Sequence, residues 1–159
     1  MINGLPAHVL LVHFVVVLAP VAGLLLILCG VWGSARRRVV WVAAGLAVVV
    51  AALTPLTIDA GEWLESRVGA SPGVMAHTRL GDSMSYVAVG LVAAGILVVA
   101  LHLRERVRPP SGVVLRVVVA AVTVVIGTAT VVQVYRIGDS GARAAWADQI
   151  SAPAPAAQP

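Results

Sequence analysis

Residues 9–32 read VLLVHFVVVLAPVAGLLLILCGVW, a run without a formal charge in which His13 is the only histidine. A helix needs about 20 apolar residues to cross the hydrocarbon core of a bilayer. The run lacks the alternation of apolar and polar residues that would favour a half-buried strand. It therefore predicts a membrane-spanning helix, and since no basic residue precedes Arg36, we expect this helix to be retained rather than cleaved as a signal peptide.

Three further apolar runs follow, over residues 39–58, 83–103 and 113–135. Only Arg116 interrupts them, close enough to one end of its run for the side chain to reach the interface. The chain is 60% hydrophobic and only 11% charged, whereas a soluble domain carries about 25% charged residues. We therefore expect an all-α integral membrane protein, a four-helix transmembrane bundle with up-down-up-down order over residues 1–147. The Ala- and Pro-rich segment 148–159 is predicted to be a disordered tail.

The charged residues divide between the two sides of this bundle. One side holds seven arginines and one acid: Arg36, Arg37, Arg38, Arg104, Arg106, Arg108 and Arg116, with Glu105. The other side holds four arginines and six acids: Arg67, Arg79, Arg136 and Arg143, with Asp59, Glu62, Glu65, Asp82, Asp139 and Asp148. Because arginine-rich loops stay in the cytoplasm, both termini and the loop 59–82 are predicted to be extracytoplasmic. The expected location is the bacterial cytoplasmic (inner) membrane, with multiple passes.

Several functional classes lack support in the sequence. The charges are too scattered for a nucleic-acid-binding surface. There is no Cys-x-x-Cys-His for covalent haem attachment, and no His-Glu-x-x-His, Gly-x-Ser-x-Gly or phosphate-binding glycine loop. No catalytic residue is predicted, and a non-enzymatic role is favoured over an enzyme.

Polar side chains collect at the extracytoplasmic ends of all four predicted helices. The candidate ligands and their partners are His8, His13, His77, Asp59, Glu62, Arg79 and Arg136. An ionisable group within a span, such as His13, is a functional candidate by default. Asp59 and Glu62 are three residues apart and share a face if the second helix continues. His8 and His13 lie about 140° apart round a helix, so they cannot both hold one ion unless His8 precedes the helix.

Two cofactor hypotheses remain open from these residue types. Two neutral imidazoles on facing helices, His13 and His77, can ligate haem b, with Arg79 and Arg136 as partners of the propionates. A divalent metal ion could instead use imidazole and carboxylate ligands. The metal candidates are His8, His13, His77, Asp59 and Glu62. The same groups also fit a plainer role, as solvated helix ends and surface ion pairs.

The opening Asn3-Gly4-Leu5-Pro6-Ala7-His8, followed by Leu11-Val12-His13-Phe14, resembles that of a bacterial family of small polytopic membrane proteins of unknown function. The family usually has His-Pro and Val-His-Phe-Pro there, and Val9 and Val15 replace both prolines. The segments 57–63 and 135–142, His77 and Trp146 also fit, although relatives often carry His where Asp139 stands. The resemblance spans residues 2–147 and implies a four-helix membrane fold. Some relatives are fused to Rieske-type iron–sulfur domains, which hints at electron transfer.

Two functions follow as hypotheses. The first is a membrane protein that binds haem b or a metal at its extracytoplasmic face for electron transfer. The second is a non-catalytic accessory or assembly subunit of a larger, respiratory membrane complex, or a homo-oligomer. Small residues let helices approach closely in lipid, and six glycines are predicted to do so: Gly23, Gly30, Gly45, Gly90, Gly95 and Gly127.

Overall fold

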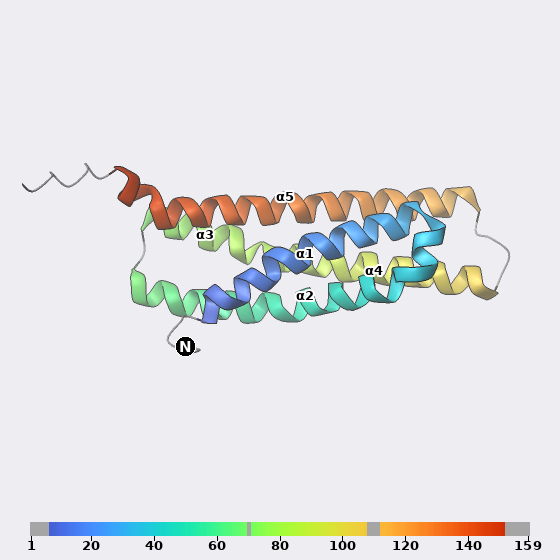
Figure 1. Cartoon of the computed structure of the whole chain (residues 1–159), viewed down its shortest axis with the longest axis horizontal. Helices are drawn as coiled ribbons and strands as arrows, with labels where there is room; N and C mark the ends of the chain where they lie inside the picture. The colour runs from blue at the N-terminus through green and yellow to red at the C-terminus, as the bar shows by residue number, and fades with distance from the viewer. Residues whose placement is uncertain (1–6, 70, 108–111, 152–159) are drawn as a thin grey trace, which may run out of the picture.

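The computed structural model describes residues 7–69, 71–107 and 112–151, with side chains up to residue 146. Five helices make up these parts of the chain (Figure 1). They are α1 (Ala7–Val31), α2 (Gly33–Val68), α3 (Pro72–Asp82), α4 (Met84–Val107) and α5 (Val113–Ser151). Part of the predicted tail, residues 152–159, lies outside the described residues.

Four helical segments are long and apolar enough to cross a membrane, which agrees with the number of spans predicted. They are Ala7–Val31, Gly33–Val68, Pro72–Val107 through the break at Ser83, and Val113–Trp146. Within the third segment α3 has no buried residue and is polar. The apolar run that needs lipid therefore lies in α4.

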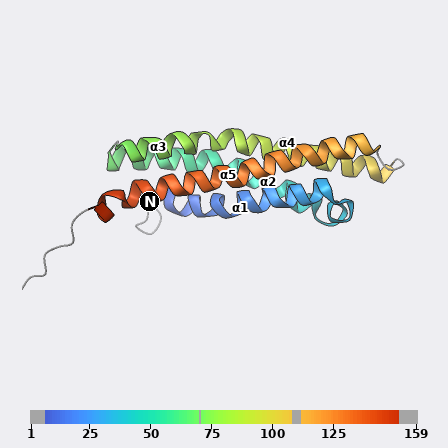
Figure 2. The same cartoon turned by 90° about the horizontal axis from the view of Figure 1, so that it is seen from above.

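The helices alternate in direction along the bundle. In both views α3, the start of α1 and the end of α5 lie at one end, and the α1–α2 connection, the end of α4 and the start of α5 lie at the other (Figures 1 and 2). We call these the α3 end and the loop end. Around the bundle α1 packs against α2 and α5. Helix α4 also packs against α2 and against α5. This is the expected up-down-up-down order.

Two helices continue well beyond their apolar runs. The predicted loop 59–82 is mostly helical, because α2 runs on to Val68 and α3 follows after Gly69, whose φ is 85°. Pro55 lies inside α2 without ending it. The added turns of α2 include Ala60, Glu62, Leu64 and Glu65, which are good helix formers. The extra turns of α2 and α5, together with α3, build a polar extension of the bundle at the α3 end.

The loop end is held by an ion-pair network that runs from buried Arg36 to exposed Arg116. Arg36 is only 3% exposed, and its guanidinium donates to the carbonyl oxygen of Cys29 at 2.9 Å and to Glu105 at 2.6 Å. Arg116 donates to the other carboxylate oxygen of Glu105 at 2.8 Å. Glu105, the one acid on the arginine-rich side, therefore joins α2, α4 and α5. Its contact with Arg36 supplies the opposite charge that a buried guanidinium requires.

Candidate functional site

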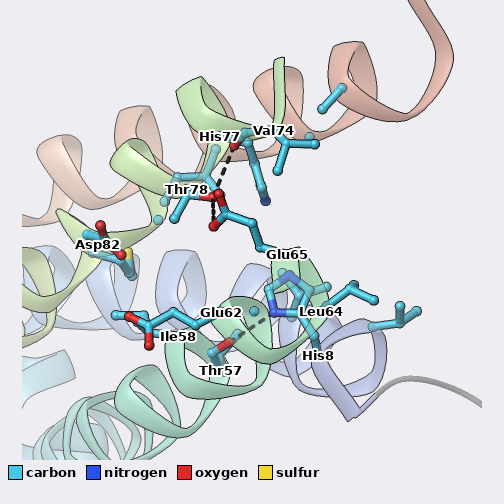
Figure 3. Close-up of a pocket in the computed structure, with 18 of the residues that line it drawn as sticks. His8, Thr57, Ile58, Glu62, Leu64, Glu65, Val74, His77, Thr78 and Asp82 are labelled. Atoms are coloured by element: carbon cyan, nitrogen blue, oxygen red, sulfur yellow. Dashed lines mark hydrogen bonds between the residues drawn. The ribbon is translucent and has the colours of Figure 1, made fainter. Parts of the chain in front are cut away.

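A cavity of about 640 Å³ lies at the α3 end, and all five helices contribute to its wall (Figure 3). Most of the wall is apolar, with Val9, Val12, Val16, Val74 and Ile137 among its residues. Its polar groups are two histidines, three carboxylates and several hydroxyls: His8, His77, Glu62, Glu65, Asp82, Thr54, Thr57, Ser71 and Thr78. Sites for drug-sized ligands and cofactors usually measure about 300–1,000 Å³ and combine an apolar wall with a few polar groups. The cavity has both properties.

His8 enters the cavity from the first turn of α1. Its Nδ1 lies 2.9 Å from the carbonyl oxygen of Thr57 on α2. A carbonyl can only accept a hydrogen bond, so Nδ1 is the donor. The ring lies against Gly61, where a Cβ would be 3.0 Å from Nδ1. Gly61 therefore provides the space that the His8 ring occupies.

His77 enters from α3 and is held in the same way by α5. Its Nδ1 lies 3.0 Å from Oγ of Ser140. The Ser140 hydroxyl donates its hydrogen to the carbonyl oxygen of Ile137 at 2.9 Å, so its oxygen accepts from His77. A Cβ on Gly141 would lie 3.0 Å from Cε1 of the ring. The Ser140 hydroxyl and the space left by Gly141, both on α5, together set the orientation of the His77 ring.

The two imidazoles come from different helices and lie close together. Their ring centroids are 6.4 Å apart and their planes are inclined at 85°. Figure 3 shows them in the same part of the cavity. When Nδ1 of a neutral imidazole carries the hydrogen, Nε2 keeps the lone pair that binds metals. A hydrogen bond from the second ring nitrogen to an oxygen is what orients metal-ligating histidines in proteins. His8 and His77 both have this arrangement.

The carboxylates give the cavity a negative character. Glu65 accepts a hydrogen bond from the Thr78 hydroxyl at 3.0 Å, which links α2 to α3. Glu62 and Asp82 also line the cavity, and their side chains are largely exposed. The charged groups that reach the cavity among the described residues are therefore acidic.

The other predicted site residues lie outside the cavity wall. His13 is exposed, and its Nδ1 is hydrogen-bonded to the carbonyl oxygen of Val9 on its own helix. Asp59, Arg79 and Arg136 are exposed as well. Within the described residues, no group of three or more His, Cys, Asp or Glu side chains is placed to hold a metal ion. The structure thus brings His8, not His13, to His77.

Several contributors to the site escaped the sequence reasoning. Sequence placed His8 and His77 at a common level, and the angle of about 140° between His8 and His13 is consistent with only one of them facing inward. The carbonyl of Thr57, the hydroxyl of Ser140 and the spaces at Gly61 and Gly141 were not singled out as ring partners. All four residues fall in the two segments, 57–63 and 135–142, that carry the family resemblance.

Comparison with known proteins agrees with the membrane fold. The family model described as "Predicted membrane protein (DUF2231)" matches residues 4–153. No curated protein and no solved structure matches the chain. The match includes both histidines of the cavity and the segments that hold them. The protein belongs to the DUF2231 family of predicted membrane proteins, whose function is unknown.

Proposed function

We propose that this protein binds haem b between His8 and His77 and serves in electron transfer at the extracytoplasmic face of a bacterial cytoplasmic membrane. The observation that carries the proposal is the pair of imidazoles in the cavity. Each is fixed through Nδ1, at 2.9 Å and 3.0 Å, in the tautomer that leaves Nε2 to bind iron. His8 takes the role that the sequence suggested for His13.

The number of ligands favours haem over a bare metal ion. A structural zinc site takes four protein ligands and a catalytic one takes three. Haem iron needs no more than two, because the porphyrin fills the other four positions. The cavity offers two imidazoles, and its 640 Å³ and largely apolar wall suit a large, flat, apolar cofactor.

The charges of the site constrain how such a cofactor would lie. Glu62, Glu65 and Asp82 on the wall would repel the haem propionates. A bound haem would therefore have to keep its propionates away from these carboxylates. Arg79 and Arg136 are exposed on α3 and α5 and remain the candidates to pair with them.

The orientation in the membrane rests on the distribution of arginine. Among the described residues the loop end carries six arginines and one acid, so the positive-inside rule supports a cytoplasmic loop end and an extracytoplasmic α3 end. Cysteine labelling in intact cells checks this. In a Cys29→Ala background, Ser66→Cys should react with an impermeant maleimide, whereas Ser34→Cys should react only after the cells are permeabilised.

Titration of the purified apoprotein with hemin tests the proposed ligands. His8→Ala and His77→Ala should each lose the low-spin spectrum, because each removes one of the two histidines that would hold the iron. His13→Ala is the matched control and should bind like the wild type, since His13 lies outside the cavity. Unchanged binding and spectrum in both His8→Ala and His77→Ala would rule out this pair as the ligands.

A further inference from the structure

The short helix α3 covers the cavity and reaches the apolar core through Leu80, which is partly buried against it. It carries five wall residues, Val74, His77, Thr78, Gly81 and Asp82, yet none of its own residues is buried. In Figure 1 it lies at the end of the bundle beside α5. A segment with little buried apolar surface opens at low free-energy cost compared with the core.

Polar contacts hold α3 in its observed position. Thr78 donates to Glu65 on α2 at 3.0 Å, and His77 donates to Ser140 on α5 at 3.0 Å. Each such hydrogen bond contributes little net free energy, because water replaces it when the contact opens. The contacts therefore fix one closed position and still permit release.

A hinge lies where α3 meets α4. Ser83 interrupts the helix, and Met84, which follows it, is 3% exposed and belongs to the core. Gln133 on α5 anchors this point, since its amide donates to the carbonyl oxygen of Leu80 at 3.1 Å and to the Ser83 hydroxyl at 2.7 Å. At its other end α3 follows Gly69, which has a positive φ of 85°. The Ser83 end is thus anchored by hydrogen bonds to α5, whereas Gly73, near the other end, meets Ala144 of α5 in van der Waals packing.

We infer that α3 is a lid that turns about Ser83 and opens the cavity to the aqueous phase. Opening would separate His77 from His8 and expose the wall for entry of the ligand. The motion depends only on the contacts of α3, whereas the identity of the ligand rests on the proposed function. A cofactor bound by both histidines would join the lid to α1 and hold it closed.

A disulfide between α3 and α5 tests the lid. A Cβ on Gly73 would lie 3.6 Å from Cβ of Ala144, within the range of about 3.5–4.5 Å found in disulfides. In a Cys29→Ala background, Gly73→Cys with Ala144→Cys should form this bond with diamide and release it with dithiothreitol. Gly73→Cys alone is the control, because it has no partner thiol.

Oxidation of methionine reports on opening without any cofactor. Hydrogen peroxide transfers one oxygen to the thioether sulfur and leaves as water. Met84 lines the cavity and is 3% exposed, whereas Met75 on α3 is 44% exposed and serves as the internal standard. With the disulfide closed, the Met84 sulfoxide should form about tenfold or more slowly than in the Cys29→Ala parent, because local opening is blocked. The rate at Met75 should stay the same.

A second variant covers the case in which the double cysteine protein does not fold. Thr78→Val keeps the shape of the side chain and removes its hydrogen bond to Glu65, so it should speed oxidation of Met84. Equal Met84 rates in the disulfide-closed protein and in its Cys29→Ala parent, which has no thiol for peroxide to oxidise, or no effect of Thr78→Val, would overturn the lid. Lid-dependent oxidation of Met84 in a protein that never binds hemin would leave the lid standing and refute the haem proposal.

Discussion

At the residue scale, the site depends on groups that a sequence does not mark as partners. His8 and His77 were candidates from their type and level. The His8 ring is held by the carbonyl of Thr57, which lies 49 residues away along the chain, and the His77 ring by the hydroxyl of Ser140, 63 residues away. A backbone carbonyl is present at every residue and so cannot be predicted as a partner from the sequence. Ser140 is a neutral residue next to the charged Asp139, which is the more obvious candidate. Asp139 in fact pairs with Arg143 on the surface at 3.0 Å.

Removing the Ser140 hydroxyl should weaken the site without removing a ligand. In Ser140→Ala the Nδ1 of His77 loses its acceptor, so both the tautomer and the orientation of the ring are released. Loss of such a partner typically lowers metal affinity about 10- to 100-fold. Hemin titration measures it, with Ser85→Ala, an exposed serine on α4, as control. Equal affinity in Ser140→Ala and Ser85→Ala would contradict a positioning role for Ser140.

At the scale of elements, glycines set how closely the helices pack. A Cβ on Gly23 would lie 3.3 Å from Cα of Gly127, so α1 and α5 meet backbone to backbone. Gly30 and Gly95 also face neighbouring helices closely, as predicted. The prediction for Gly45 is wrong, because a Cβ there would meet nothing within 4 Å. The sequence lists the glycines, but only the rotation of each helix decides which of them face inward.

Gly127→Ala should therefore separate α1 from α5. The new Cβ would lie 2.6 Å from Cδ1 of Ile27, which can move, and 2.8 Å from the carbonyl oxygen of Gly23, which cannot. Overpacking of this kind costs about 1–3 kcal/mol. The melting temperature in detergent should fall, whereas Gly138→Ala on the same helix, with open space around it, should leave it unchanged or raise it. Equal melting temperatures for both variants would refute this close contact.

At the scale of the whole molecule, hydropathy located the spans but not the ends of the helices. Asp59 and Glu62 mark where the apolar run stops, yet α2 continues for several more turns to Val68. A charged residue ends contact with lipid, whereas only the backbone ends a helix. For this reason the polar extension that forms the cavity was predicted as a loop. The role of accessory subunit stays a prediction, and copurification of partners in mild detergent would test it.

The central claim is that the paired histidines at the α3 end hold haem b. The most direct test is the absorption spectrum of the protein purified from cells that supply haem, first oxidised and then reduced with dithionite. The proposal predicts a Soret band that sharpens on reduction, with split visible bands typical of iron held by two imidazoles. A spectrum without these bands in both states, from folded protein, would contradict it.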